Sequence, residues 1–265
     1  MLLALLVSLL AGLATSIGGL LALHKRFLER SFLATALGFA AGAMLFISFV
    51  QVIPFGIDAV GDSYGEGAAG WIIYGAFFAG AALVALIDHF LPKSLNPSEI
   101  EGKEDDLTQR DKRANKKLLR SGILVALVLA LHNFPEGMTT FFATYQDVSA
   151  GVVLAIAIAI HNIPEGIAVA APVYAATGSR RKALTWATVS GLTEPLGALV
   201  AYALLNVFIP TELFGVMFGL IAGMMVFIAI DELLPAARRY QTDKHQVIYG
   251  LVAGMAVVAL SILLI

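Results

Sequence analysis

Long stretches without charge dominate this chain of 265 residues and limit how it can fold. A helix needs about 20 apolar residues to cross the hydrocarbon core of a bilayer. Hydrophobic residues make up 59% of the chain and charged residues 14%, whereas soluble domains average about 45–50% and about 25%. We therefore predict an all-α, polytopic membrane protein with eight transmembrane helices, at about residues 1–23, 32–54, 67–91, 118–145, 149–174, 182–208, 212–236 and 246–265.

The basic residues all fall on one side of this layout. The 17 Lys and Arg residues lie in or beside the odd-numbered loops, and the even-numbered loops contain none. Because cytoplasmic loops are enriched in Lys and Arg, the odd loops are predicted to be cytoplasmic and both termini to lie outside. The four basic groups are at residues 25–30, 93–120, 180–182 and 238–244.

The third loop, at about residues 93–117, differs from the other loops in length and composition. It combines six acidic residues with its basic ones and has little apolar content. A segment of this kind buries too little apolar surface to fold, so we expect a disordered cytoplasmic linker. Apart from this linker, residues 1–265 are expected to form a single transmembrane domain.

An internal repeat relates the second span to the seventh. At a constant offset of 181, seven of 17 positions are identical. The two spans run in opposite directions across the membrane, so the halves of the chain are predicted to have inverted topology, as in many secondary transporters. Chance similarity between apolar helices is the alternative, but matched Gly and Pro favour a repeat. In the second span the identical positions are Gly38, Ala41, Gly42, Met44, Phe46, Ile47 and Pro54.

The string His-Asn-x-Pro-Glu-Gly occurs twice, at residues 132–137 and 161–166, which are 29 residues apart. Both copies lie inside apolar spans, where ionisable side chains are costly and usually functional. The His and Glu of each copy are four residues apart and so share one face of a helix. Each copy therefore presents an imidazole beside a carboxylate, an arrangement that suits a metal ion.

The two copies are predicted to lie at the same depth in the membrane. They belong to the fourth and fifth spans, which form a hairpin with its tip near residues 146–149. Glu136 lies 11 residues before Asp147 and His161 lies 14 residues after it. At ~1.5 Å per residue their depths differ by about 5 Å. The two helices are therefore expected to bring two His, two Asn and two Glu toward one another.

A third carboxylate, Glu194, lies in the middle of the sixth span, directly before Pro195. No Lys or Arg lies at this depth, so three Glu together would repel one another and take up protons. A divalent cation resolves the conflict, and neutral imidazole with carboxylate suits Zn²⁺. The alternative for Glu194 is a protonated side chain in an interhelical hydrogen bond.

The candidate ligands suffice for two adjacent ions that share a bridging Glu. The chain contains no Cys, so thiolate ligands are excluded. Met44 lies at the middle of the second span as a candidate soft ligand, with ordinary packing as the alternative. The predicted metal ligands are His132, Asn133, Glu136, His161, Asn162, Glu165, Glu194 and Met44.

Polar residues near the ends of other spans form two weaker candidates. Those near the cytoplasmic ends suit either an inner exit station or the membrane interface: Asp88, His89, Asp231 and Glu232. Those near the outer end of the second span suit either cation attraction or a solvated face: Gln51, Asp58, Asp62 and Glu66.

Together these residues resemble the ZIP (Zrt/Irt-like protein) family of divalent-metal transporters, in particular its bacterial zinc-uptake members. The doubled string carries the resemblance, and residues 193–195, residues 231–235 and the eight-span layout add to it. The resemblance covers the whole chain. It implies a symmetry of three plus two plus three helices, a location in the cell inner or plasma membrane, and alternating access by sliding of one helix bundle against another.

The resemblance further implies import into the cytoplasm of Zn²⁺, or of Fe²⁺, Mn²⁺, Co²⁺ or Cd²⁺, through a binuclear site. The metal is then the substrate, and no cofactor is expected. Metal ions and the lipid bilayer are the expected partners, with a homodimer as the candidate assembly and no nucleic acid. The implied ligands of one ion are His132, Glu136 and Glu165, with Met44 and His161 nearby. Those of the second are Asn133, Asn162 and Glu194, with Glu136 and Glu165 shared.

Two other classes of protein were weighed against a metal transporter. An intramembrane zinc-dependent enzyme typically carries His-Glu-x-x-His, and this string is absent. Gly-x-Ser-x-Gly occurs once, at residues 61–65, but it lies in the loop after the second span and not on the strand-to-helix turn that a nucleophilic serine needs. A metal-gated channel or a proton-coupled carrier of organic substrates is the second alternative. Large aromatic or Arg-lined sites for an organic substrate are not evident in the spans, whereas the sequence does not separate a channel from a carrier. We therefore expect a protein that is not an enzyme.

Overall fold

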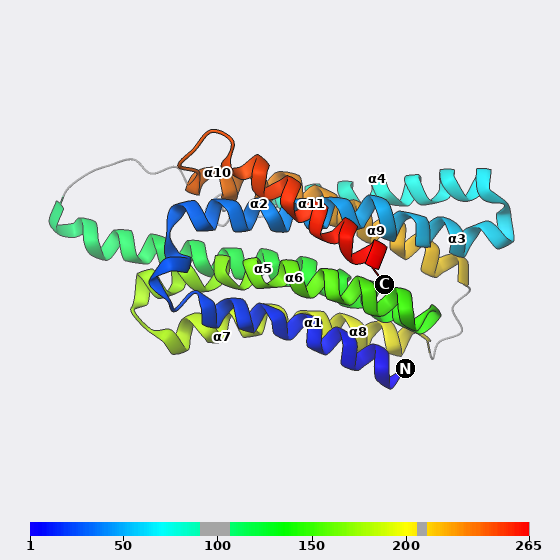
Figure 1. The fold of residues 1–265 in the computed structure, drawn as a ribbon, viewed down its shortest axis with the longest axis horizontal. Coiled ribbons are helices and arrows are strands. Elements are labelled where there is room, and N and C mark those ends of the chain that lie inside the picture. Colours follow the sequence, from blue (N-terminus) through cyan, green and yellow to red (C-terminus); the bar gives the residue numbers. More distant parts are fainter. Residues whose placement is uncertain (91–106, 206–210, 265) are drawn as a thin grey trace.

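The computed structural model describes residues 1–90, 107–205 and 211–264, and every regular element in these ranges is a helix. The helices are almost parallel to one long axis (Figure 1). They are α1 (Leu2–Leu21), α2 (Arg30–Ile47), α3 (Ile53–Tyr64), α4 (Glu66–Phe90), α5 (Leu107–Gln146), α6 (Val148–Thr177), α7 (Arg180–Gly191), α8 (Thr193–Leu205), α9 (Thr211–Ile228), α10 (Leu234–Tyr240) and α11 (Gln246–Leu264).

Six of the described helical runs are long and apolar enough to cross a membrane. This confirms an all-helical membrane fold, while the count of eight spans stays a prediction. The sixth predicted span is divided at Leu192 into α7 and α8, each too short to cross alone. The fourth falls within α5, whose side chains are described only in part. The six runs are Leu2–Leu21, Arg30–Tyr64, Gly67–Leu86, Val148–Thr177, Glu212–Tyr240 and Gln246–Leu263.

Helix α5 begins earlier than the predicted fourth span. It starts at Leu107, inside the segment 93–117 for which the sequence predicted a disordered linker. The helix includes residues 107–117 because Lys, Arg, Gln, Leu and Ala, which favour helices, are frequent there. Residues 93–106 of the predicted linker lie outside the described residues.

The helices form two layers that pack side by side (Figure 1). In one layer α1 packs on α6, α6 on α5, α5 on α8, and α1 on α7. In the other, α2 packs on α11, α4 packs on α9, and α3 contacts both α4 and α9. Contacts of α6 with α2 and of α5 with α9 join the layers. The two helices that carry the doubled string therefore lie where the layers meet.

The inverted repeat is visible in the backbone. Helices α2 and α9 both end in a five-residue π-helical turn, Ser48–Val52 and Ala229–Leu233. The two turns are 181 residues apart, the offset found in the sequence. A proline follows each of them, Pro54 and Pro235. A proline ring clashes with the carbonyl four residues before it, and the wider turn relieves that clash.

The packing of α2 and α9 against their neighbours repeats in the same way. A methyl group at Gly42 would lie 2.0 Å from the carbonyl oxygen of Leu251, and one at Gly223 would lie 1.8 Å from that of Phe77. Residues 42 and 223 differ by 181, and residues 77 and 251 differ by 174. Backbone contact at these glycines thus relates α4 to α11 as well, as expected for three plus two plus three helices.

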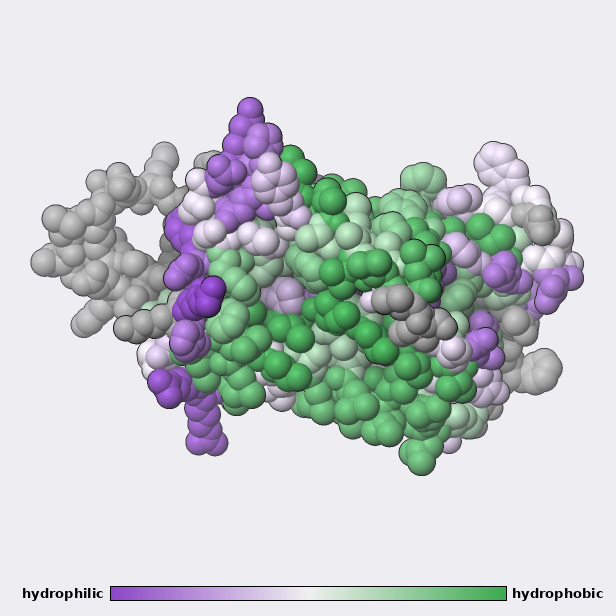
Figure 2. Space-filling view, in the orientation of Figure 1, coloured by the Kyte–Doolittle hydropathy of each residue, from purple (hydrophilic) through white to green (hydrophobic). Residues whose placement is uncertain are grey.

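The surface agrees with a position in a membrane. Apolar residues cover the middle of the face in Figure 2, and hydrophilic residues gather toward the two ends of the long axis. Large apolar side chains point outward along the helices, including Trp71, which is 84% exposed, and Phe78, which is 68% exposed. An aqueous protein rarely exposes apolar surface on this scale, so the face is suited to lipid.

Candidate metal centre

Helices α5 and α6 form the predicted antiparallel hairpin. Asp147 separates them, and its carboxylate accepts a hydrogen bond of 3.0 Å from the backbone N–H of Ala150, which caps the start of α6. Pro135 lies inside α5 and Pro164 inside α6, and both helices continue through them. The two copies of the string therefore lie side by side between the layers.

His161 and Glu136 meet across this hairpin, and both are fully buried. Nε2 of His161 lies 3.2 Å from Oε1 of Glu136, and Nδ1 lies 3.1 Å from the carbonyl oxygen of Ala157. Because a carbonyl only accepts, Nδ1 carries a proton, and the contact of Nε2 with Oε1 needs a second proton shared between the imidazole and the carboxylate, which a metal ion would displace. A histidine that ligates a metal commonly donates its other N–H to a carbonyl in this way.

Asn162 and Glu194 form a second buried pair. The side-chain NH₂ of Asn162 donates to Oε2 of Glu194 at 2.8 Å and to the carbonyl oxygen of Ala11 at 3.0 Å. These two bonds fix the amide so that its oxygen remains as the acceptor. The Glu194 carboxylate from α8 is thereby brought against the second copy of the string.

Asn133, in the first copy, is held in the same manner. Its NH₂ group donates to the carbonyl oxygen of Ser190 at 3.2 Å. The hydroxyl of Ser190 in turn donates to the carbonyl oxygen of Ala126 at 3.2 Å. The asparagines of both copies are therefore anchored through nitrogen to a neighbouring helix. The oxygen of each amide is buried and has no hydrogen-bond partner among the described residues.

Four buried oxygens of predicted ligands have no hydrogen-bond partner within the part of the chain that the structure describes. Amide oxygens and the oxygens of ionised carboxylates can only accept, and leaving a buried acceptor unsatisfied costs about 1–3 kcal/mol. A divalent cation would satisfy several of them together. The four are Oδ1 of Asn133, Oε2 of Glu136, Oδ1 of Asn162 and Oε1 of Glu194.

The remaining predicted ligands occupy the expected helices. Glu165 is fully buried one turn after His161, and Met44 is fully buried in α2. His132 lies in α5, but its side chain is outside the described residues. Among the described side chains, no three His, Asp or Glu form a group arranged to hold a metal. The complete ligand set therefore stays a prediction.

The weaker candidates lie away from the doubled string. Asp231 and Glu232 are half-buried in the π-helical turn after α9, and Gln51 is buried in the matching turn after α2. His89 is exposed near the end of α4, and the side chains of Asp88 and Glu66 lie outside the described residues. Asp58 and Asp62 are exposed on α3. The predicted roles of these residues, in an inner exit station or in attracting cations, therefore stay predictions.

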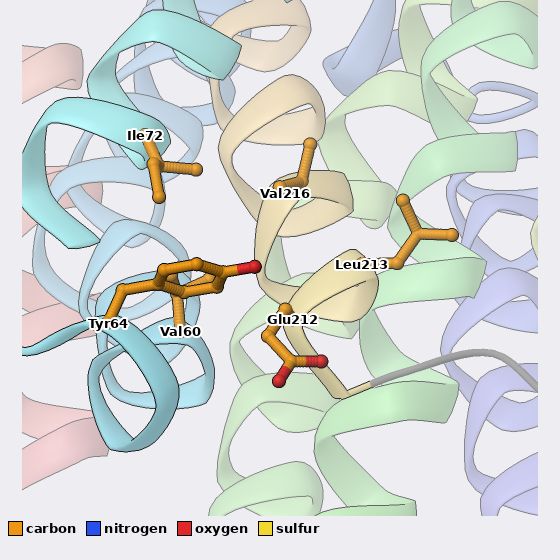
Figure 3. A pocket seen from close by; sticks show the side chains of 6 residues that line it. All are labelled: Val60, Tyr64, Ile72, Glu212, Leu213 and Val216. Carbon is orange, nitrogen blue, oxygen red and sulfur yellow. The ribbon is translucent and has the colours of Figure 1, made fainter. Parts of the chain in front are cut away.

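A cavity of about 360 Å³ lies between α3, α4 and α9 (Figure 3). Tyr64 and Glu212 enter it from α3 and α9, and the Glu212 carboxylate accepts a hydrogen bond from Ser63. None of its lining residues belongs to the predicted ligand set. The other lining residues are Val60, Ile72, Leu213 and Val216.

Sequence reasoning did not include α1 in the site. The carbonyl of Ala11 holds Asn162, and a methyl group at Gly166 would lie 1.9 Å from the carbonyl oxygen of Thr15. A signal was present in the sequence, because residues 12, 13 and 18 match residues 191, 192 and 197 at an offset of 179. This second register of the repeat relates α1 to α7 and α8.

Buried carboxylates and imidazole between apolar helices, within an inverted repeat, define a polytopic helical transporter. The chain belongs to the ZIP zinc transporter family, whose model matches residues 1–262. The resemblance read from the sequence is confirmed, as is the expectation that the chain is a metal transporter and not an enzyme.

Relatives in several bacteria are similar over nearly the full chain. A zinc transporter ZupT of Corynebacterium glutamicum is 49% identical over 262 residues, which cover 97% of each chain. One of Oceanobacillus iheyensis is 48% identical over 265 residues, covering 100% of this chain and 98% of the relative. One of Clostridium perfringens is 43% identical over 275 aligned residues, covering 99% and 96%.

Proposed function

We propose that this chain imports Zn²⁺ into the cytoplasm through a binuclear metal centre at the middle of the membrane. The observation that carries the proposal is the approach of Nε2 of His161 to Oε1 of Glu136 at 3.2 Å from two antiparallel helices. Both atoms are ligands that Zn²⁺ accepts. The spans supply no Lys or Arg at this depth to neutralise the carboxylate, which favours a cation as its partner.

The first ion is proposed to bind between the two copies of the string. Glu136 and Glu165 are both fully buried and belong to different helices, which suits carboxylates that bridge two ions. His161 approaches Glu136, so its Nε2 is directed at the proposed position of this first ion. The proposed ligands are His132, Glu136 and Glu165, with His161 and Met44 beside them.

The second ion is proposed to bind on the side of the asparagines. The nitrogen of each amide is committed to a backbone carbonyl, which directs the oxygens of Asn133 and Asn162 inward. Glu194 is held at Asn162 by a hydrogen bond of 2.8 Å. Because oxygens and imidazole are not selective ligands, Fe²⁺, Mn²⁺, Co²⁺ and Cd²⁺ are further proposed substrates.

We infer the orientation from the charge of the loops. Basic residues in the odd loops favour a cytoplasmic location for those loops, with both termini outside the inner or plasma membrane. The proposed unit is one transmembrane domain of residues 1–265, with a homodimer as its assembly. Alternating access would then carry the ion from the outer face to the cytoplasm.

Metal flux into proteoliposomes tests the proposal. Vesicles loaded with a fluorescent chelator would report entry of Zn²⁺ and Cd²⁺ through wild type and through Glu165→Ala. We expect flux through wild type and at least a tenfold loss in the variant, because even residues that only orient metal ligands contribute about 10–100-fold. Glu212→Gln, at the cavity between α3, α4 and α9, is the matched control and should behave as wild type. Wild-type protein without flux, or a Glu165→Ala variant with full flux, would refute the proposal.

A further inference from the structure

The repeat extends to the helices that hold the doubled string. Helix α1 packs on α6, and α8 packs on α5. A methyl group at Gly18 would lie 2.0 Å from the carbonyl oxygen of Ile163, and one at Gly197 would lie 2.0 Å from that of Phe134. Residues 18 and 197 differ by 179, and residues 134 and 163 differ by 29. The two packings are therefore equivalent residue by residue.

The backbone carbonyls that hold the two asparagines are related by the same offsets. Asn162 donates to the carbonyl of Ala11, and Asn133 donates to the carbonyl of Ser190. Residues 11 and 190 differ by 179, and residues 133 and 162 differ by 29. Both amides are thus held by equivalent carbonyls in equivalent orientations. Each side of the metal centre is a copy of the other in its backbone.

Thr15 occupies the position that is equivalent to Glu194. A methyl group at Gly137 would lie 1.8 Å from the carbonyl oxygen of Glu194, and one at Gly166 would lie 1.9 Å from that of Thr15. Glu194 reaches Asn162. The same symmetry predicts that Thr15 faces Asn133, and in the structure Oγ1 of Thr15 lies beside Gly191, the residue after the Ser190 carbonyl that holds Asn133. The two sides therefore differ in one residue that bears on charge: a carboxylate on one side and a hydroxyl on the other.

The hydroxyl of Thr15 is free to act as a ligand. Thr15 is fully buried, and its Oγ1 has no hydrogen-bond partner among the described residues. A buried helical Thr usually bonds to the carbonyl four residues before it, as Thr139 does with Pro135 at 3.0 Å. For Thr15 that carbonyl is Ala11, which accepts the amide of Asn162 instead.

We propose that Thr15 is a further ligand of the second metal ion, opposite Glu194. The assignment rests on the proposed function and adds a residue of α1 to its site. The hydroxyl supplies a neutral oxygen where the repeat-related position supplies a negative one. The centre thereby binds a divalent cation between a charged and an uncharged side. Thr15 is then a determinant of affinity and of which metal is accepted.

The first test removes the hydroxyl and keeps the shape. Thr15→Val should raise the KM for Zn²⁺ flux by about three- to tenfold, the loss expected for one neutral polar contact. Thr15→Ser keeps the hydroxyl and should restore most of the affinity. Thr139→Val is the control, because that hydroxyl bonds within its own helix. A KM for Thr15→Val equal to that of wild type would overturn the assignment.

The second test moves the carboxylate to the other side. Glu194→Thr should lower flux at least about tenfold, and adding Thr15→Glu to it should recover a large part of that loss. The equivalent glycines pack against both positions in the same way: a methyl group at Gly12 would lie 3.2 Å from Cβ of Glu194, and one at Gly191 would lie 2.8 Å from Cβ of Thr15. A folded double variant with flux no higher than Glu194→Thr would overturn the assignment. Thermal unfolding in detergent identifies folded variants.

The outcomes separate this inference from the proposed function. If wild type transports Zn²⁺, Glu136→Ala does not, and either Thr15 test fails, only the assignment of Thr15 falls. If wild type shows no flux, the proposed function falls and the inference falls with it. If the tests succeed, the metal centre includes a residue from the first helix of the chain.

Discussion

The chemistry of the centre depends on how its polar atoms are divided between anchoring and binding. His161 uses Nδ1 to bond to the carbonyl of Ala157, and Asn162 uses its nitrogen to bond to Ala11 and Glu194. In each side chain the atom that remains, Nε2 of His161 or Oδ1 of Asn162, is the one that would bind a metal ion. The anchoring bonds therefore orient the ligands before an ion arrives, which lowers the entropic cost of binding it.

At Glu136 we expect a loss of function without a loss of fold. Glu136→Gln keeps the volume of the side chain but removes the charge that a divalent ion needs. Flux of Zn²⁺ should fall at least about tenfold, while thermal unfolding in detergent stays near that of wild type. Glu212→Gln should leave both quantities unchanged. Flux of the Glu136→Gln variant within twofold of wild type would exclude this carboxylate as a ligand.

At Met44 we expect a change in metal preference. Met44 is fully buried, and Leu is a replacement that cores usually tolerate at less than about 1.5 kcal/mol. Met44→Leu removes a soft thioether, so the ratio of Cd²⁺ flux to Zn²⁺ flux should fall roughly twofold or more. Met255→Leu, in α11, is the control. An unchanged ratio would support ordinary packing as the role of Met44.

Close contact between helices fixes the relative positions of the ligands. Gly137 lies one residue after Glu136 and packs directly on the backbone of Glu194, and Gly166 packs on Thr15 in the same way. A carboxylate on α5 and one on α8 are thereby brought near each other without a connecting hydrogen bond. The glycines of the doubled string act through packing, and its polar residues act through ligand chemistry.

A methyl group at Gly137 should separate the helices. Gly137→Ala would place a carbon 1.8 Å from the carbonyl oxygen of Glu194, so α5 and α8 must move apart. We expect destabilisation of about 1–3 kcal/mol, typical of overpacking, measured as a lower midpoint of thermal unfolding. Gly75→Ala meets nothing within 4 Å and should not lower that midpoint. Equal midpoints for Gly137→Ala and wild type would contradict the close contact.

The sequence predicted these elements better than their contacts. Hydropathy predicted α5 and α6, and the doubled string predicted that their motifs face each other. Both predictions succeed because the length of an apolar run and the i, i+4 spacing of polar residues can be read directly from the side chains. The break at Leu192 was missed because Gly191 and Pro195, which flank it, are also common inside membrane spans that continue unbroken. The anchors Ala11 and Ser190 were missed because they act through backbone carbonyls, which every residue has.

Across the whole molecule, the backbone follows the inverted repeat but the charged residues do not. The backbone repeats at offsets of 181, 179 and 174, so the two halves present equivalent packing to α5 and α6. The charges do not repeat: Glu232 stands where the other half has Gln51, and Glu194 stands where it has Thr15. An inverted fold with unequal charges can present different chemistry to the two sides of a membrane.

The orientation of the molecule can be tested because the chain has no cysteine. Thr242→Cys, between α10 and α11, should react with a membrane-impermeant maleimide only from the cytoplasmic side, because its loop is basic. Ser63→Cys, near the end of α3, should react from outside. Intact cells and inverted vesicles provide the comparison. Labelling of Thr242→Cys in intact cells would contradict the proposed topology.

The measurement that tests the central claim most directly is X-ray absorption at the zinc edge of the loaded protein. The account predicts two Zn²⁺ per chain with nitrogen and oxygen ligands at about 2.0–2.2 Å and a metal–metal distance of about 3.5–4 Å. In Glu165→Ala the metal–metal distance should disappear. One Zn²⁺ per wild-type chain without a neighbouring metal, or a spectrum unaffected by Glu165→Ala, would contradict a binuclear centre at the doubled string.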